Sequence, residues 1–170
     1  KLKKNELKGK ILLEPESRNT TGAIYLAASY ADLKDTLLIM PADHLIPQVN
    51  EFVDIINFSN KNLYTDHWVT FGIRPTNPSA LFGYIKVKEN KLNTKKIKNF
   101  FDVERFIEKP SYEESSRLIS SGNYFWNSGI FFAKADFIIQ SITKFAPEIV
   151  SVCNELLNKT INTEEISFDK

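Results

Sequence analysis

The sequence has little cysteine and no long apolar run. Cys153 is the only thiol among 170 residues, which excludes an internal disulfide framework and any zinc site built from several cysteines. No apolar run approaches the roughly 18 residues needed to span a bilayer. Polar Asn5 and Glu6 follow the basic residues 1–4, where a signal peptide would have its apolar core. We therefore expect a cytoplasmic protein without a membrane partner.

The net charge is also close to zero. The chain has 22 Lys and Arg against 21 Asp and Glu, a formal net charge of +1, which is too balanced to predict nucleic acid as a partner. Apolar residues make up 42% and charged residues 25% of the chain, as in an ordinary globular domain with its own hydrophobic core. The binding partners must therefore be inferred from individual sites.

The two ends of the chain do not resemble the ends of a complete domain. The first residue is not Met, and residues 166–170 stop within an alternation of apolar and polar residues without a terminating turn. No internal repeat or low-complexity linker marks a domain boundary. We therefore expect residues 1–170 to be part of one domain.

Hydrophobic periodicity predicts strands and helices that alternate along the chain. The apolar residues 36–40 are typical of a strand buried on both faces, and Ser111 followed by Glu114 is a strong helix start. Alternating strands and helices favour an α/β fold with a largely parallel sheet. The expected strands are residues 10–13, 36–40, 68–73, 82–87, 101–107 and 129–133, and the expected helices are residues 23–31, 51–58, 112–120, 135–144 and 147–157.

Asp43 lies just after the most apolar strand, in the segment Pro41-Ala42-Asp43-His44. Ligands bind beyond the carboxyl ends of strands in open parallel sheets, so this carboxylate is expected in the crevice. Carboxylates shared with substrate phosphates are typical ligands of Mg²⁺. Capping of the following loop is an equally good interpretation of Asp43 from local features alone.

Glu108 and Lys109 follow another expected strand and precede Pro110. The proline disfavours helical geometry at Lys109, which predicts that the pair is extended at the strand end. A neighbouring acceptor and cation suit a sugar hydroxyl and its phosphate. A surface ion pair before a helix is the simpler alternative.

Two glycine-containing motifs offer polar groups beside permissive backbone. Asn127-Ser128-Gly129 combines an amide with a glycine just before an apolar strand, although a turn into that strand explains it too. Gly83, before Tyr84, lies inside a strand pattern, where a glycine often marks the close approach of a ligand or another backbone.

Two further polar segments have simple structural interpretations beside the functional ones. Glu14, Arg18, Asn19 and Thr20 form a loop suited to a base edge or a phosphate, and helix capping explains Asn19 and Thr20 equally well. The lysine-rich residues 89–99 are expected to form a solvated hairpin, with a phosphate-binding patch as the alternative.

Six motifs, in this order, resemble those of the mannose-1-phosphate guanylyltransferase family. The resemblance spans most of the chain, from about Leu12 to Leu157. The motifs are Glu14-Pro15-x-x-Arg18-Asn19-Thr20, Pro41-Ala42-Asp43-His44, Val69-Thr70-Phe71-Gly72-Ile73-x-Pro75-Thr76, Gly83-Tyr84-Ile85, Phe106-x-Glu108-Lys109-Pro110 and Trp126-Asn127-Ser128-Gly129.

The resemblance implies a fold, a reaction and a set of partners. The implied fold is a Rossmann-like, glycosyltransferase-A-like nucleotidyltransferase domain with a mixed, mostly parallel sheet flanked by helices. The implied reaction is guanylyl transfer from GTP to mannose 1-phosphate, which gives GDP-mannose and pyrophosphate with Mg²⁺ as cofactor. GTP and mannose 1-phosphate are the implied partners, and a homo-oligomer is a further option.

The resemblance also implies roles for individual residues. Asp43 matches the metal ligand, and Lys109 matches a catalytic cation that offsets phosphate charge. The residues that match the nucleotide side are Glu14, Arg18, Asn19 and Thr20, and those that match the sugar-phosphate side are Gly83, Tyr84, Glu108, Lys109, Asn127 and Gly129.

The chain departs from the family pattern in two places. The family's Gly-Gly-x-Gly-x-Arg-Leu loop and its later metal-binding aspartate are absent from residues 1–170. We therefore expect the central part of a nucleotidyltransferase domain, inactive by itself. Two alternatives stay open: a catalytically silent sugar-nucleotide-binding regulatory domain of the same fold, and a nucleotidyltransferase for another sugar 1-phosphate.

Overall fold

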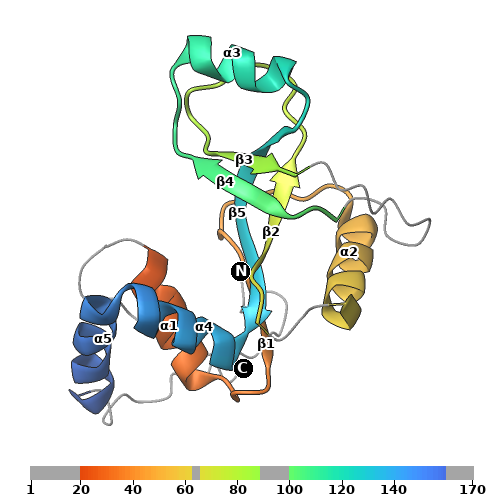
Figure 1. Ribbon diagram of the computed structural model, residues 1–170. Coiled ribbons are helices and arrows are strands. Elements are labelled where there is room, and N and C mark those ends of the chain that lie inside the picture. Colours follow the sequence, from red (N-terminus) through yellow and green to blue (C-terminus); the bar gives the residue numbers. More distant parts are fainter. Residues whose placement is uncertain (1–19, 63–65, 89–99, 160–170) are drawn as a thin grey trace. The chain divides into compact units, whose positions relative to one another are not determined.

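The structure is a computed structural model that describes residues 20–62, 66–88 and 100–159 (Figure 1). The expected strand at residues 10–13 and the lysine-rich residues 89–99 lie outside the described residues. Glu14, Arg18 and Asn19 do so as well. The described residues fall into two compact units, a helical unit and a sheet unit.

The described elements match the expected alternation of helices and strands closely. Boundaries differ from the expected ones by a few residues, except that β5 begins five residues before its expected start. The elements are α1 (Thr20–Tyr30), β1 (Thr36–Ile39), α2 (Val49–Asn62), β2 (Val69–Ile73), β3 (Tyr84–Val87), β4 (Val103–Ile107), α3 (Tyr112–Ser120), β5 (Tyr124–Lys134), α4 (Ala135–Phe145) and α5 (Pro147–Lys159).

The helical unit consists mainly of α1, α4 and α5, which pack against one another (Figure 1). Its core is apolar: Ala28 of α1 and Ile138 of α4 have no exposed surface, and Cys153 of α5 is also buried. A cross-link between helices comes from Tyr25, whose hydroxyl donates to Asn154 Oδ1 at 3.1 Å. Helix packing therefore stabilises this unit mainly by burial of apolar side chains.

Among the described residues, five strands form a sheet in the order β1-β5-β3-β4, with β2 also paired with β5. The pairs β2–β5, β3–β4 and β3–β5 are all antiparallel. The expectation of a mostly parallel sheet is therefore wrong, whereas the α/β class is correct. For the pair β3–β4 the reason is visible in the chain order, because β4 follows β3 without a described helix between them. A parallel pair would need a long crossover connection, usually a helix.

Strand β1 also differs from its expected environment. All four of its residues are half-buried rather than fully buried, although its apolar sequence is typical of a strand covered on both faces. An apolar run specifies a strand, but the elements that cover the strand are set elsewhere in the chain.

Helix α3 packs on the sheet unit through a small apolar core (Figure 1). Leu118 of α3, Tyr84 of β3 and Tyr124 of β5 form the buried cluster, and Ile107 packs against it. Ser111 caps the helix as expected, because its side chain accepts from the Glu114 backbone N–H. Gly122 follows the helix with a φ of 79°, a left-handed conformation that suits glycine and ends the helix.

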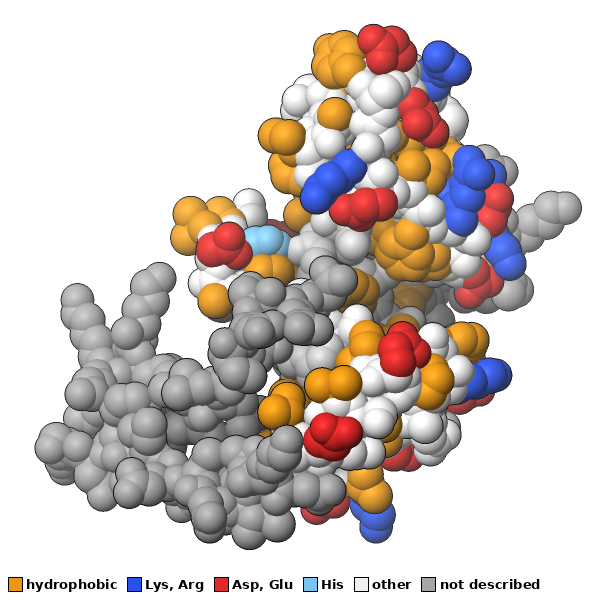
Figure 2. All heavy atoms as spheres, turned by 90° about the vertical axis from the view of Figure 1, so that its left-hand side faces the viewer, with side chains coloured by type: hydrophobic (Ala, Val, Ile, Leu, Met, Phe, Trp, Pro, Cys, Tyr) orange, Lys and Arg blue, Asp and Glu red, His pale blue; other side chains and the backbone are white. Residues whose placement is uncertain are grey.

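The surface carries charges of both signs. Acidic and basic side chains are interspersed on the face shown in Figure 2. Among the described residues, no helix combines the length and the apolar character needed to cross a membrane.

Candidate functional site

Three of the residues predicted to bind the sugar phosphate lie together in the sheet unit. Gly83 precedes β3, Glu108 follows β4 and Asn127 lies in β5. The Asn127 backbone N–H donates to the Gly83 carbonyl at 2.8 Å. A Cβ atom at Gly83 would lie 2.9 Å from Glu108 Oε2 and 3.7 Å from Asn127 Cβ. We call Gly83, Glu108 and Asn127 the polar cluster.

A larger residue at position 83 would displace the Glu108 carboxylate from its present place. The sequence predicted the close approach of a ligand or another backbone at Gly83. In the structure the closest group is the Glu108 side chain, and the Ile107 carbonyl would lie 3.6 Å from a Cβ there, an ordinary contact distance. Strands β5, β3 and β4 are neighbours in the sheet, which explains why residues 83, 108 and 127 meet although they are far apart in the sequence.

A bulge in β5 holds Asn127 in place. Thr70 is opposite Phe131 and Gly72 is opposite Asn127, so two steps along β2 match four steps along β5. Gly129 adopts a φ of 69° within this bulge. The expected turn before a strand is thus an irregularity inside a longer strand, because Asn, Ser and Gly suit both structures. Bulges redirect side chains and are frequent beside active sites.

Side chains within the bulge satisfy its backbone groups. Asn127 Oδ1 accepts from the Gly129 N–H at 3.1 Å, and Ser128 Oγ accepts from the Ile130 N–H at 3.1 Å. Ser128 is buried, whereas Asn127 is half-buried and reachable from solvent. The arrangement is therefore rigid but leaves the Asn127 amide accessible to a ligand.

Lys109 has an unusual backbone conformation. Its φ is 44°, and among the described residues no other non-glycine residue has a positive φ. The expectation of an extended Lys109 is therefore wrong. The chain must turn sharply between β4 and the cap of α3, and buried Pro110 limits where the turn can be made. Such conformations store strain and are concentrated at functional sites.

The charged ends of Glu108 and Lys109 both face solvent. Lys109 Nζ lies 3.7 Å from Glu108 Oε1, and the Lys109 and Glu108 side chains are 65% and 74% exposed, respectively. An ion pair this exposed contributes little to stability, so both groups are available to a ligand at small cost.

Asp43 lies in the turn after β1 and is exposed, as is His44. A Cβ atom at Gly129 would lie 3.5 Å from Pro41 Cγ, so the β5 bulge is next to the segment that leads to Asp43. Within the described parts of the chain, no group of three His, Cys, Asp or Glu residues could hold a metal ion by itself. Asp43 therefore fits a metal only as one ligand shared with substrate oxygens, which is the usual arrangement for Mg²⁺.

Tyr84 and Thr20 are the two remaining predicted residues that the structure describes, and neither belongs to the polar cluster. The Tyr84 ring is fully buried, and its hydroxyl donates to the Ser79 carbonyl and accepts from the Ser79 N–H. Any contact of Tyr84 with a substrate would therefore come from its backbone. Thr20 is exposed at the first position of α1, in the helical unit. The roles of both residues stay predictions.

Thr70 and Phe82, for which the sequence predicts no individual role, lie beside the polar cluster. Thr70 Oγ1 lies 3.4 Å from Asn127 Oδ1. The Phe82 ring packs on Trp126 with centroids 4.9 Å apart, and Phe82 is 44% exposed. Phe82 precedes Gly83, so an exposed aromatic residue next to a strand glycine was an available signal. Thr70 had none, because a threonine in a strand is ordinary.

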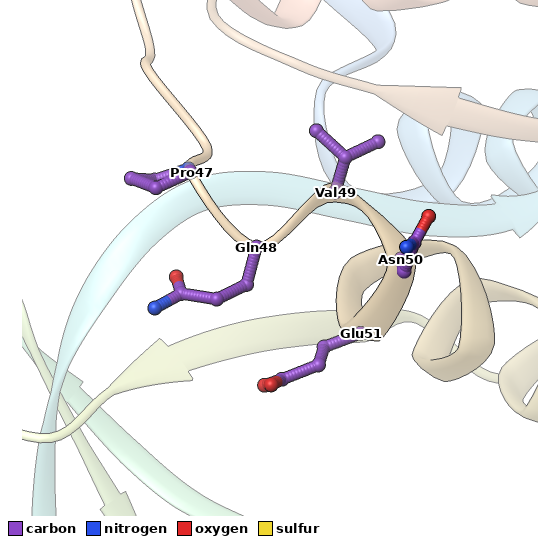
Figure 3. Close-up of a pocket in the computed structure, with 5 residues that line it drawn as sticks. All are labelled: Pro47, Gln48, Val49, Asn50 and Glu51. Carbon is purple, nitrogen blue, oxygen red and sulfur yellow. The ribbon is translucent and has the colours of Figure 1, made fainter.

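A shallow hollow at the start of α2 contains none of the predicted residues (Figure 3). Five consecutive residues, 47–51, line it, and the side chains of Gln48 and Glu51 extend from the same side of the chain. A hollow formed by one helix turn lacks the converging elements of a ligand pocket. The polar cluster is therefore the stronger candidate site.

Comparisons with known proteins identify the family of the chain. The sequence model of the family described as "Nucleotidyl transferase" matches residues 1–170. "Mannose-1-phosphate guanylyltransferase 2" of Escherichia coli O157:H7 is 36% identical over 163 residues, which are 92% of this chain and 34% of that protein. "Xanthan biosynthesis protein XanB" of Xanthomonas campestris is 36% identical over 85% of this chain and 30% of that protein. The chain thus spans about a third of the length of these relatives.

Two solved structures have a similar fold. Mannose-6-phosphate isomerase from Helicobacter pylori is 34% identical, with a TM-score of 0.78 over 91% of this chain and 58% of that one. A protein from Thermus thermophilus, described as mannose-1-phosphate geranyltransferase, is 30% identical, with a TM-score of 0.75 over 86% of this chain and 42% of that one. With the family match over all 170 residues, these similarities show that the chain belongs to the nucleotidyl transferase family.

Proposed function

We propose that the protein transfers a guanylyl group from GTP to mannose 1-phosphate, which yields GDP-mannose and pyrophosphate. The observation that supports the proposal most is the polar cluster. In it Glu108, after β4, and Asn127, in β5, meet at Gly83, next to Lys109. Relatives named mannose-1-phosphate guanylyltransferase supply the choice of nucleotide and sugar. Both substrates are charged metabolites of the cytoplasm, which is where we place the reaction.

The chemistry of the proposed reaction requires positioning and charge stabilisation rather than a nucleophilic side chain. A phosphate oxygen of mannose 1-phosphate attacks the α-phosphorus of GTP in line. The bond from that phosphorus to the bridging oxygen breaks, and pyrophosphate leaves. Holding both reactants in line and offsetting the charge on the phosphates account for most of the catalysis in phosphoryl transfers of this kind.

The residues of the site have separate tasks in this proposal. Glu108 accepts a hydrogen bond from a sugar hydroxyl, and Asn127 fixes a further hydroxyl. Lys109, whose exposed ammonium lies beside the polar cluster, binds the sugar phosphate. The left-handed backbone of Lys109 supports this role, because a strained conformation is retained where it serves a site.

Asp43 is the residue that we propose as a ligand of Mg²⁺. It is an exposed carboxylate in the segment next to Gly129 of the β5 bulge. Mg²⁺ bound there would supply positive charge against the substrate phosphates. One or two carboxylates together with phosphate oxygens are a usual ligand set for Mg²⁺.

Steady-state kinetics of the complete protein tests the proposal. Pyrophosphate release is measured with GTP, mannose 1-phosphate and Mg²⁺, and glucose 1-phosphate and ATP serve as comparison substrates. We expect kcat/KM for mannose 1-phosphate to fall in Glu108→Gln, Lys109→Ala and Asn127→Ala. Lys109→Ala should fall most, because a hydrogen bond to a charged group is worth about 1.5–3 kcal/mol.

Lys61→Ala is the matched control, since Lys61 is an exposed lysine in α2, outside the polar cluster. This variant should behave like the wild type. An unchanged kcat/KM for mannose 1-phosphate in all three site variants would contradict the assignment of the site. A wild-type protein that forms no nucleotide sugar would contradict the proposed function.

A further inference from the structure

Thr70 has the position of a residue that orients Asn127. It lies in β2, and its hydroxyl oxygen is 3.4 Å from Asn127 Oδ1 and 3.3 Å from the Ile130 carbonyl. Both distances are longer than a typical O–H···O bond, as expected when one hydroxyl proton is shared between two acceptors. Thr70 therefore joins the two ends of the β5 bulge from the neighbouring strand.

The orientation of the Asn127 carboxamide follows from its partners. The Gly129 N–H can only donate, so the Asn127 atom 3.1 Å from it must be the oxygen. The Thr70 hydroxyl, which faces the same oxygen, must then act as a donor as well. With the oxygen held from two directions, the amide nitrogen of Asn127 points away from both donors.

The Asn127 amide nitrogen has no hydrogen-bond partner among the described residues, and the side chain is half-buried. It therefore offers two N–H donors on a side chain whose Cβ lies next to Gly83 of the polar cluster. A ligand group that binds there must present an acceptor oxygen. Glu108, as a carboxylate, offers only acceptors, so the two side chains are complementary.

We propose that Thr70 is a positioning residue that, together with the Gly129 N–H, fixes the Asn127 amide as a donor to a ring hydroxyl oxygen of the sugar phosphate. This inference rests on the proposed function for its ligand. It goes beyond that function because it assigns a role to Thr70 and a hydrogen-bonding direction to Asn127. Without the Thr70 hydroxyl, the amide rotates more freely and meets the sugar less often in the productive orientation.

Kinetics of the complete protein tests the role of Thr70. Thr70→Val removes the hydroxyl but keeps the shape, and we expect KM for mannose 1-phosphate to rise about three- to tenfold, the effect of one lost hydrogen bond. The kcat and the KM for GTP should change less than about twofold. Thr70→Ser keeps the hydroxyl and should restore KM. In an Asn127→Ala background, Thr70→Val should have no further effect.

Three results would overturn the role of Thr70. They are a wild-type KM in Thr70→Val, a failure of Thr70→Ser to restore KM, and an equal loss from Thr70→Val in the Asn127→Ala background. Asn127→Asp tests the hydrogen-bonding direction. It should be at least as impaired as Asn127→Ala, because a carboxylate cannot donate, and near-normal activity would refute the donor role.

A readout independent of activity separates this inference from the proposed function. In protein labelled with ¹⁵N-asparagine, the side-chain resonances of Asn127 are identified by their absence from Asn127→Ala. We expect two sharp, separate proton resonances in wild type and Thr70→Ser, and broadened or shifted ones in Thr70→Val. Identical spectra in wild type and Thr70→Val would refute the orienting role even if the protein acts on other substrates.

Discussion

The polar cluster and the helical unit are stabilised by different interactions. In the helical unit, Ala28 and Ile138 are fully buried, and apolar contact between helices is the main stabilising interaction. In the polar cluster, Glu108 is 74% exposed and Asn127 is held by hydrogen bonds within the β5 bulge. Substitutions in the helical unit should therefore change the free energy of unfolding, whereas substitutions in the polar cluster should change catalysis.

The largest expected change is the loss of stability in the helical unit. Ile138→Ala removes a side chain with no exposed surface from α4, and such truncations cost about 2–5 kcal/mol because they leave a cavity. Urea denaturation should show this loss in the free energy of unfolding. Val152→Ala in α5, where the side chain is 57% exposed, is the control and should change stability by less than about 0.5 kcal/mol.

If the helical unit and the polar cluster are independent, Ile138→Ala should leave the site unchanged. At a temperature where the variant is folded, its KM for mannose 1-phosphate should equal that of the wild type. A large change in KM without a loss of stability would show that the helical unit acts on the site directly.

The next largest change is expected at Asp43. Asp43→Asn keeps the shape of an exposed side chain but removes its charge, and metal-assisted charge stabilisation is typically worth several kcal/mol. We expect Mg²⁺-dependent turnover to fall about a hundredfold or more, with an unchanged thermal unfolding midpoint. Near-normal turnover would show that Asp43 is only a loop residue, and the exposed Asp54→Asn serves as the control.

Gly83 and Gly72 allow the polar cluster and the packed sheet to be compared with the same substitution, glycine to alanine. In Gly83→Ala, the added Cβ meets the Glu108 carboxylate, the mobile end of an exposed side chain. We expect almost no loss of stability but about a tenfold fall in kcat/KM for mannose 1-phosphate, because Glu108 loses its position.

In Gly72→Ala, the added Cβ lies 2.8 Å from Phe125 Cβ, which cannot move without shifting β5. We expect a loss of stability of about 1–3 kcal/mol, as for other overpacked sites. Thermal unfolding measures the stability of both variants, and kinetics measures their kcat/KM for mannose 1-phosphate. Equal stability losses in the two variants would contradict the distinction between the site and the packed sheet.

The smallest change is expected for an ion pair at the sheet surface. Lys86 Nζ of β3 lies 2.7 Å from Glu104 Oε1 of β4. The hydrogen bond from Lys86 holds the pKa of Glu104 below its ordinary value of 4.5. A carboxyl group with a lowered pKa in the folded state adds stability above its unfolded pKa, and that stability is lost as the pH falls through the folded pKa.

Glu104→Gln should therefore lower the thermal midpoint slightly at pH 7. The difference from wild type should vanish in acid, below the folded pKa of Glu104, because protonation removes the same charge. Kinetic constants at pH 7 should not change. A difference in midpoint that persists unchanged at low pH would assign the effect to packing rather than to charge.

The sequence by itself determined most of the local structure. Apolar periodicity predicted the positions of the helices and strands, and Ser111 with Glu114 predicted the cap of α3. The ordered motifs predicted the family, and the family match over residues 1–170 confirms it. These features depend on neighbours in the chain, and local preferences are readable from sequence.

Only the tertiary structure decided which residues meet. The antiparallel strand pairing, the left-handed backbone at Lys109 and the bulge that places Asn127 beside Gly83 depend on contacts between distant segments. The contact of Thr70 with Asn127 joins residues 57 positions apart. Strand register and pairing direction are set by packing and connections across the whole sheet, which no local pattern specifies.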